Sequence, residues 1–405
     1  MKFFLIILLV PVIITINVFA QQKNVVATTK SSIDYHIEKI YSNDKIIWSF
    51  EFINEKTIIF TEKKGKMYLL IDDKIQEISG VPEIYFMGQG GLMDIELHPK
   101  FKENNMIFLS FAEGSSDNKG GHTAIMSAML DQNKLINSKI LYRGKENSNK
   151  GQHWGSRLQF DKDGFLYFTI GDRGNRNSNP QDLSRDGGKV YRINEDGSIP
   201  KDNPFVNQDN SINAIYSYGH RNPQGIFLHP KSGMIWTNEH GPKGGDEINI
   251  IRKGKNYGWP KITYGKNYNG SIITNLKEFS GMEQPLYYWI PSIAPSCFEY
   301  ISSNRYNDWK GSLLAGSLSF GYLERLVLDN QNKVVYREKI AKDIGRVRDV
   351  IESLDGYIYF SVENQDINLP HKTLKDITPK ALVRRCTIKN GKIKLPGCGY
   401  FLGEI

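Results

Sequence analysis

The sequence predicts an all-β fold, and more specifically a six-bladed β-propeller. The main observation is a repeated unit in which a turn precedes a short apolar and aromatic strand. A second observation is that no long stretch has the 3.6-residue apolar period and the caps of a helix. The composition agrees, because 37 glycines, 21 tyrosines and 20 phenylalanines suit turns and strands.

The repeated strand occurs six times, with starts about 60 residues apart on average. The copies begin at residues 57, 106, 165, 234, 312 and 357 and read TIIFT, MIFLS, FLYFT, MIWTN, SLLAG and YIYFS. This spacing leaves room for four strands in each unit, and a closed ring of such units leaves few exposed edges. We therefore expect one domain over residues 33–405, with an irregular pair of β-sandwiches as the alternative. The widest spacings predict that the longest loops, and a functional site, lie between residues 165 and 357.

The amino terminus predicts export. Lys2 precedes an apolar run of 12 residues, Phe3 to Ile14, which is too short to span about 30 Å of hydrocarbon. The following Val18-Phe19-Ala20 resembles a cleavage site, so residues 1–20 are predicted to be a signal peptide and 21–32 a flexible lead-in. An uncleaved anchor is the alternative. We expect a periplasmic or secreted protein with no stable membrane insertion after cleavage.

Charge and cysteine content limit the possible partners. The formal net charge of +8 is spread along the chain without a dense basic block, so no nucleic-acid partner is expected. Cys386 and Cys398 flank an Asn-Gly turn signal and could form a local disulfide in an oxidising compartment. Cys297 is then left over and is predicted to be a buried thiol.

Four segments contain more polar, glycine and proline residues than strand turns require. They are 88–93 (GQGGLM), 152–158 (QHWGSRL), 218–225 (YGHRNPQG) and 238–249 (NEHGPKGGDEIN), the last followed by KNYGWP at 255–260. Together they could supply a base, a cation, amides and the hard oxygen ligands that Ca²⁺ prefers. The histidines elsewhere are predicted to be surface or structural residues: His36, His98, His122, His229 and His371.

At these segments the chain resembles the soluble pyrroloquinoline quinone (PQQ)-dependent aldose sugar dehydrogenases. The resemblance is strongest over residues 88–260 and continues more weakly through 290–296, 312–318 and 345–351. It implies a six-bladed propeller, an exported protein, a sugar substrate, an electron acceptor that the sequence does not identify, and the cofactors PQQ and Ca²⁺.

The resemblance implies a role for individual residues. His153 falls on the family's general base, which would take a proton from the anomeric hydroxyl while hydride passes to the quinone. Arg221 matches the cation against the quinone oxygens, where it would stabilise developing negative charge. The implied cofactor-binding residues are Gln89, His153, Arg221, Asn222, His240, Ser319, Arg346 and Arg348. The implied Ca²⁺ ligands are the carbonyls of Gly241 and Pro242 at the cofactor, and Glu247 with the Tyr257 carbonyl at a second, structural site.

One position departs from the family pattern. Ser319 stands where many relatives have a lysine that meets the cofactor. Loss of one charged hydrogen bond would weaken the binding of a polyanion by about 1–3 kcal/mol. Lys243, which is near in sequence to the cofactor motif, is a candidate substitute.

The leading interpretation is an oxidoreductase that converts the C1 hydroxyl of an aldose to the lactone. One alternative is a non-catalytic propeller that binds sugar or protein, which Ser319 favours. Another is a Ca²⁺-dependent lactonase, which would share the metal and His153 but would not need the cation cluster of Arg221, Arg346 and Arg348.

Overall fold

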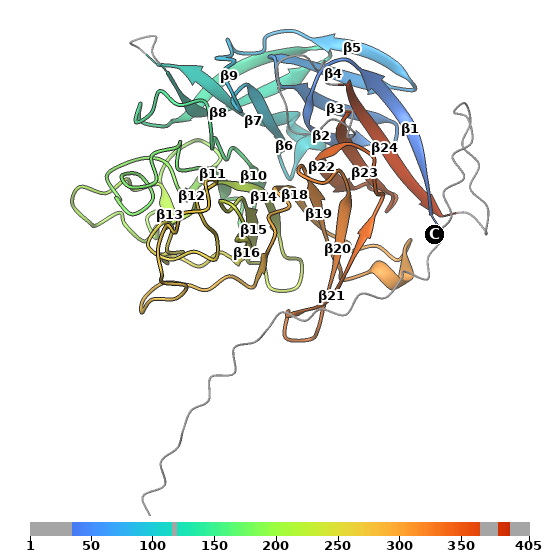
Figure 1. The fold of residues 1–405 in the computed structure, drawn as a ribbon. Helices are drawn as coiled ribbons and strands as arrows, with labels where there is room; N and C mark the ends of the chain where they lie inside the picture. Colours follow the sequence, from blue (N-terminus) through green and yellow to red (C-terminus); the bar gives the residue numbers. More distant parts are fainter. Residues whose placement is uncertain (1–34, 116–119, 365–379, 389–405) are drawn as a thin grey trace, which may run out of the picture.

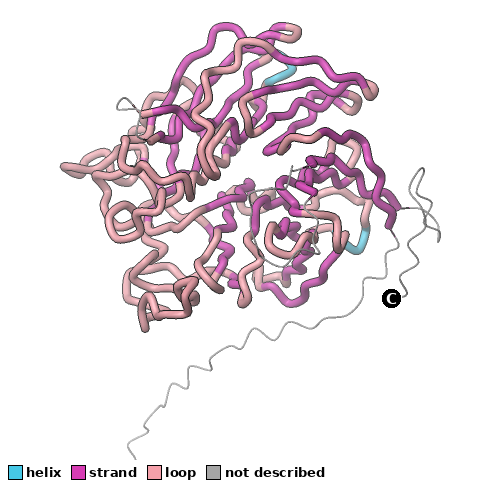
Figure 2. The backbone as a smooth tube through the Cα atoms, turned by 45° about the horizontal axis from the view of Figure 1, so that its top comes forward, coloured by secondary structure: helices cyan, strands magenta, loops and turns pink. Residues whose placement is uncertain are grey.

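The computed structural model describes residues 35–115, 120–364 and 380–388. Strands dominate this part of the chain, and its helix is confined to α1 (Phe101–Asn104) and the 3₁₀ turn η1 (Asn307–Trp309) (Figure 2). The predicted all-β propeller class is confirmed. Among the described residues, no helix has the length and apolar character needed to cross a membrane.

Five four-stranded sheets are each built from strands that follow one another in the chain. The first two contain β2 (Ile47–Asn54), β3 (Thr57–Glu62), β4 (Lys66–Ile71) and β5 (Lys74–Ile78), then β6 (Leu92–Leu97), β7 (Met106–Gly114), β8 (Gly121–Asp131) and β9 (Lys134–Arg143). The next two contain β10 (Leu158–Phe160), β11 (Leu166–Ile170), β12 (Lys189–Ile193) and β13 (Ile215–Tyr218), then β14 (Pro223–Leu228), β15 (Ile235–Glu239), β16 (Asp246–Ile250) and β17 (Tyr287–Trp289). The fifth contains β18 (Pro295–Tyr300), β19 (Leu313–Ser317), β20 (Leu323–Leu328) and β21 (Val334–Ile340).

A sixth sheet joins the two ends of the chain. It contains β22 (Arg346–Glu352), β23 (Ile358–Asn364), β24 (Lys380–Ile388) and β1 (Tyr35–Asn43). The first and last strands pair antiparallel, with Tyr35 opposite Ile388, so β1 and β24 lie side by side in Figure 1. The pairing closes the ring, and β1 becomes the outer edge strand of this sheet.

The repeated strand is the second strand of every sheet. The structure places its six copies in β3, β7, β11, β15, β19 and β23, at or one residue after the predicted starts. The first strands β2, β6, β10, β14, β18 and β22 contact one another in a closed cycle. Because each sheet has four antiparallel strands, the first strands all run in the same direction around the axis.

Aromatic and aliphatic side chains fill the space between neighbouring sheets. Phe108 of β7 meets Phe160 of β10 edge to face, with ring centroids 4.8 Å apart. Phe227 of β14 meets Phe298 of β18 in the same way, also at 4.8 Å. Such pairs add to the stabilisation from apolar burial. The segment 251–286, between β16 and β17, forms a long loop within the predicted range.

Cys297 is a free, buried thiol, as predicted. The proposed disulfide cannot be followed, since Cys398 lies outside the described residues, as do the signal peptide, the lead-in and His371. Three other histidines have ordinary structural partners. These are Trp236 for His229, Glu195 for His98 and Glu113 for His122.

Candidate active site

The candidate residues gather because of the way the strands are arranged. They lie in the loops that lead into first strands or at the beginning of one of them, and these strand starts all meet at one end of the ring. The residues in this position are Gln89 before β6, His153 before β10, Arg221 and Asn222 before β14, and Arg346 and Arg348 in β22. The predicted clustering of these side chains follows from the repeat.

His153 is held by a buried carboxylate that the sequence analysis did not identify. Its Nδ1 lies 2.6 Å from Oδ1 of Asp172, which is 1% exposed. The same carboxylate accepts hydrogen bonds from the backbone N–H of Gly174 (2.7 Å) and from Nε1 of Trp259 (2.8 Å). A carboxylate only accepts, so Nδ1 of His153 carries the proton and Nε2 is the basic nitrogen.

The electrostatic environment keeps His153 neutral. Burial, and then the charge of Arg221, lower the pKa of His153 below its usual 6.5, although the hydrogen bond to Asp172 opposes this. Burial alone would raise the pKa of Asp172, but the hydrogen bond from His153 and nearby positive charges outweigh it and leave that pKa low. The pair is therefore a neutral imidazole beside a carboxylate, which suits a general base.

Gln89 positions His153 through its backbone. The His153 N–H donates to the side-chain oxygen of Gln89 (2.8 Å), and the Gln89 N–H donates to the carbonyl of Gly151 (2.6 Å). His153 has a φ of +57°, in the left-handed region that non-glycine residues rarely adopt. The amide of Gln89 thus helps to hold a strained backbone at the proposed base.

Arg221 is fixed at both its backbone and its side chain. Its N–H donates to Glu239 (2.6 Å), and its Nη1 donates to the carbonyl of His240 (2.9 Å). The guanidinium carbon lies 5.4 Å from the centre of the Trp259 ring. Glu239 also accepts from His220 Nδ1 (3.0 Å), so this carboxylate organises the loop before β14 from the end of β15.

Three buried nitrogens in this group have no hydrogen-bond partner among the described residues. They are Nε of Arg221, Nδ2 of Asn222 and Nε2 of His240. Burial, followed by the charge of Arg221, lowers the pKa of His240 well below its usual value, so this ring is neutral. Buried polar atoms are nearly always bonded, and three such atoms together fit a polar ligand held against them.

A cavity of about 460 Å³ lies beside these residues. His153, Asp172, Arg221, Pro242 and Trp259 form part of its wall. Binding cavities for small molecules commonly have volumes in this range. The base and the fixed cation therefore face a space in which a small substrate can bind.

Arg346 and Arg348 form a second positive group. Arg346 Nε lies 3.1 Å from one oxygen of Glu363, and Arg348 Nε donates to the other at 2.8 Å. Lys63, at the end of β3, donates to the carbonyl of Gly88 at 2.6 Å. Burial, and then the charge of Arg348, lower the pKa of Lys63 to about 8. Two arginines thus share one carboxylate, with Lys63 close enough to feel the charge of Arg348, and this excess of positive charge suits an anionic ligand.

Lys63 is the lysine beside the arginines, and it was not identified from the sequence. Ser319 is exposed in the turn after β19, where its N–H donates to the Ile293 carbonyl at 3.1 Å. Lys243 is also exposed, and its backbone pairs with that of Lys266. Lys63 belongs to the segment after β3 and is far in sequence from the later cofactor motifs. Lys243 was predicted as the substitute lysine because it is near one of those motifs in sequence.

Asp246 stabilises the loop expected to present metal-binding carbonyls. Its two oxygens accept from the N–H groups of Gly241 (2.7 Å) and Ala294 (2.8 Å). The Pro242 carbonyl accepts from the Ser292 hydroxyl at 2.9 Å. Burial raises the pKa of Asp246 to about 6.

At the predicted second metal site, the side chains of Glu247 and Asn249 lie close together. Asn249 donates to Glu247 at 3.2 Å, and its own side-chain oxygen is buried without a partner. Burial, and then the charge of Glu239, raise the pKa of Glu247 well above its usual value. Tyr257 stacks on His220 with ring centroids 4.4 Å apart. Within the described ranges, no three Asp, Glu, His or Cys residues form a metal-binding group, so carbonyl and amide oxygens would have to contribute.

Comparison with known proteins identifies the family. The family model for glucose/sorbosone dehydrogenase matches residues 44–371. The chain belongs to this family. It is 41% identical over 288 residues to the aldose sugar dehydrogenase YliI of Escherichia coli K12, covering 70% of this chain and 76% of that protein. The resemblance inferred from the motifs is confirmed.

Two further relatives extend this comparison. Quinoprotein glucose dehydrogenase B of Acinetobacter calcoaceticus is 30% identical over 402 residues, covering 79% of this chain and 81% of that protein. The crystal structure of the soluble aldose sugar dehydrogenase from E. coli, in its apo-form, superposes with a TM-score of 0.79 at 31% identity. That match covers 88% of this chain and 100% of the other.

Three acids that organise the site occupy the same position in the repeated unit. Asp172 follows β11, Glu239 ends β15 and Glu363 lies at the end of β23, so each belongs to the end of a repeated second strand. An acid at that point in the repeat could have been used to find them. In each case a partner comes from the start of the first strand of the same sheet or from the loop before it, and Arg346 lies directly opposite Glu363.

Proposed function

We propose that the protein is a PQQ-dependent aldose dehydrogenase built on a six-bladed propeller, and that it oxidises the C1 hydroxyl of a sugar to the lactone. The C1–H bond breaks and its electron pair leaves as hydride, while the hydroxyl proton passes to Nε2 of His153 and a C1=O bond forms. PQQ, when bound, supplies the two-electron acceptor for this step. The observation that carries the proposal is the neutral His153 imidazole, bonded to the Asp172 carboxylate, at the wall of a cavity beside Arg221.

The residues of this chain fit a polar, anionic quinone. Arg221, Asn222 and His240 would hold its quinone side, because each has a buried nitrogen without a partner. Arg346 and Arg348 would hold its carboxylates, for which guanidinium groups are suited. Ser319 would contribute no charge, and Lys63 would replace the cation that relatives have at that position. Gln89 would keep His153 in place.

Calcium would have two roles. At the cofactor, the carbonyls of Gly241 and Pro242 would hold an ion that acts as a Lewis acid. At the second site, Glu247 and the Tyr257 carbonyl would hold a structural ion, supported by the unpartnered oxygen of Asn249. Export to the periplasm or beyond, after cleavage of residues 1–20, remains part of the proposal.

The direct test is product analysis after reconstitution with PQQ and Ca²⁺. The protein should convert an aldose to its lactone and reduce an artificial electron acceptor in equal amount. The same protein without PQQ is the control and should do neither. An aldose that is left unchanged would contradict the proposal.

A non-catalytic binding propeller is the second candidate, because exposed Ser319 stands where many relatives have a lysine that meets the cofactor. Lys63 argues against it, as does a base held by a carboxylate that a binding protein would not need. A lactonase would hydrolyse an added lactone without any quinone, so the same assay separates all three functions.

A further inference from the structure

The cavity beside His153 has a cationic mouth. Lys150, from the segment before β10, and Arg176, from the segment after β11, line it. Lys243 and Lys266 flank it, since each is adjacent in sequence to a lining residue and their backbones bond to each other at 2.9 Å. All four therefore belong to the loops around the same opening.

These four charges are not neutralised. Within the described part of the chain, none of the four forms an ion pair. Lys150 donates to the Gly174 carbonyl (2.6 Å) and Arg176 donates to the side-chain oxygen of Asn267 (2.7 Å), so both bond to neutral acceptors. Some surface bases elsewhere, such as Arg305, likewise bond to neutral acceptors, and others have carboxylate partners. Examples are Lys66 with Glu77, Arg143 with Glu113 and Arg252 with Glu283.

No carboxylate in the cavity wall can offset them. The acidic lining residue is Asp172, which is buried and committed to His153, Gly174 and Trp259. Unpaired charges of one sign around a concave opening focus the potential and attract ions of the opposite sign. The mouth of this cavity is therefore suited to an anionic group.

The neutral part of the wall suits a sugar. Asn175, Asn177 and Ser178 supply donors and acceptors for hydroxyl groups, while Trp259 and the largely exposed Tyr268 supply aromatic faces. Sugar recognition by amides and aromatic rings is compatible with either a neutral or a charged aldose. The unpaired cations at the opening favour an aldose with a negative charge over a neutral one.

We propose that the preferred substrate is an aldose with an anionic group, a carboxylate or a phosphate, at the end remote from C1. This inference rests on the proposed function, because it places C1 at His153. Arg176 uses one donor for Asn267, and a guanidinium has others that can bind such a group in a fork. Lys150 adds a second charge at the same opening.

The first experiment compares substrates of the PQQ-loaded protein. D-Glucose, D-glucuronate and D-glucose 6-phosphate have the same free C1 hydroxyl, and the two anions distinguish a carboxylate from a phosphate. At least one anion should have a kcat/KM about ten-fold above that of glucose at low ionic strength. Added salt should reduce this ratio. Equal values for glucose and both anions would overturn the inference.

Variants locate the effect. Arg176→Gln and Lys150→Gln should each lower the anion-to-glucose ratio of kcat/KM several-fold. Arg305→Gln is the matched control, because exposed Arg305 lies outside this cavity and donates to the Asp355 carbonyl. It should leave the ratio as it is. An Arg176→Gln protein with the wild-type ratio would contradict the assignment.

A binding measurement on the protein without PQQ separates this inference from the proposed function. Methyl glucuronide, methyl glucose 6-phosphate and methyl glucoside cannot be oxidised at C1, and calorimetry measures their affinities. Tighter binding of an anion, weakened by Arg176→Gln, supports the inference even if no aldose is oxidised, in which case only the proposed function fails. Equal binding of all three, or no binding of any, overturns the inference.

Discussion

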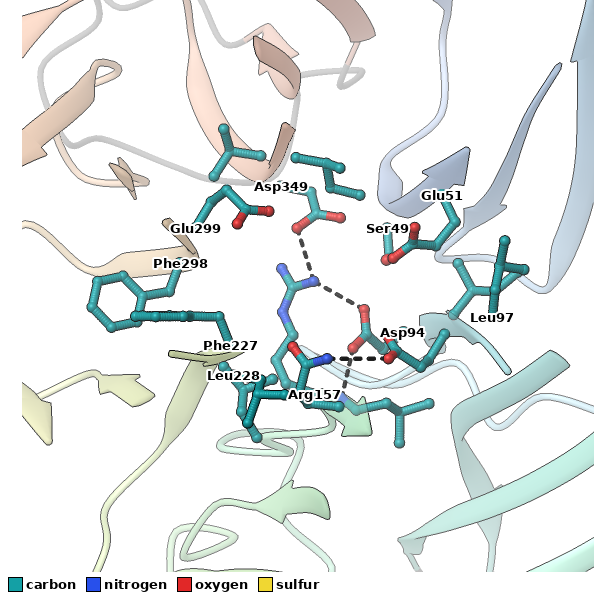
Figure 3. Close-up of a pocket in the computed structure, with 17 residues that line it drawn as sticks. Ser49, Glu51, Asp94, Leu97, Arg157, Phe227, Leu228, Phe298, Glu299 and Asp349 are labelled. Carbon is teal, nitrogen blue, oxygen red and sulfur yellow. Dashed lines mark hydrogen bonds and ion pairs between the residues drawn. The ribbon is translucent and has the colours of Figure 1, made fainter. Parts of the chain in front are cut away.

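The two ends of the first strands carry ionisable side chains of opposite kinds, basic at one end and acidic at the other. At the starts of these strands, Arg221, Arg346, Arg348 and Lys63 gather at the candidate active site. Farther along the same strands is a central cavity of about 360 Å³. Figure 3 shows its carboxylates turned inward around a single arginine, Arg157. The acids lining it are Glu51, Asp94, Glu96, Glu299 and Asp349.

Burial disfavours the charged form of a side chain at both ends, but it shifts the pKa in opposite directions, up for the acids and down for the histidines. It raises the pKa of Glu96 and of Glu299 to about 8, because it disfavours the charged carboxylate. At the other end it lowers the pKa of His153 and His240, and the positive charge of Arg221 adds to this. The comparison indicates that the acidic end retains protons, while the cationic end keeps its bases neutral and its excess charge free for an anionic ligand.

Arg157 is the cation that compensates the acidic end. Its Nη1 lies 2.9 Å from both Asp94 and Asp349, its Nε donates to the Gln224 carbonyl at 2.8 Å, and its Nη2 donates to the Ser296 carbonyl at 2.7 Å. These partners lie on four different first strands, and Arg157 immediately precedes a fifth. One side chain therefore ties five sheets together at the axis.

The largest effect is expected at the cationic end, on catalysis. His153→Gln removes the proposed base and should lower kcat about 10²–10⁴-fold, while PQQ affinity stays within a few-fold. Turnover and cofactor binding should be measured on the same preparation. Wild-type turnover in this variant would rule out His153 as the base. In the wild type, the acid limb of the kcat/KM profile should lie below pH 6.5, since the pKa of His153 is lowered.

The next effect is expected at the acidic end, on stability. Arg157→Met leaves Asp94 and Asp349 buried without a cation, and should lower the free energy of unfolding by about 3–5 kcal/mol. Urea denaturation measures this. Replacing both acids by Asn in the same variant should restore part of the loss. Arg305→Met is the surface control and should change stability by less than about 0.5 kcal/mol; a similar loss in both variants would contradict the role of Arg157.

A smaller effect is expected for Lys63. Lys63→Met should weaken PQQ binding by about 1.5–3 kcal/mol, the range for a hydrogen bond to a charged group. Lys64→Met removes an exposed lysine next to it and should leave the affinity close to that of wild type. Ser319→Lys adds the cation that many relatives have at this position and should tighten PQQ binding. If Lys63→Met binds as tightly as Lys64→Met, another group supplies the cation.

The pH dependence of stability tests the acidic end more finely. Burial raises the folded pKa of Glu96 and Glu299 from the usual 4.5 to about 8, so the folded state retains protons that the unfolded chain has lost. The stabilising contribution of these two groups should therefore be fully present below about pH 4.5 and be lost as pH rises towards 8, by at most about 1.4 kcal/mol per pH unit for each group. The double variant Glu96→Gln, Glu299→Gln should flatten this fall between pH 5 and 8. Glu103→Gln, an exposed control, should not.

Chelation should have the smallest effect. Removal of Ca²⁺ should lower the melting temperature by a few degrees if Glu247 and Tyr257 hold a structural ion, because a ligand that binds only the folded state stabilises it. Glu247→Gln should remove the difference between chelated and Ca²⁺-loaded protein. An unchanged melting temperature in the wild type would count against that site.

The sequence predicted the repeat and the loops but not the contacts between them. Strand starts follow from local turns and apolar patterns, and motif position was the basis for proposing His153 and Arg221. Lys63 was missed because it reaches the arginines from a neighbouring sheet, and Asp172 because its Trp259 contact joins residues 87 positions apart. Glu363 lies directly opposite Arg346 in one sheet, so only the strand pairing would have revealed it. The link from Arg157 to the Arg348 carbonyl joins residues 191 positions apart, and no local pattern encodes such a distance.

The most direct test of the account is a titration with PQQ and Ca²⁺, followed by absorbance of the bound quinone and then by addition of a panel of aldoses. The account predicts saturable binding and bleaching of the quinone by at least one aldose, with His153→Gln binding PQQ but resisting bleaching. Absence of binding at high micromolar PQQ would contradict the account, and the non-catalytic propeller would become the leading function.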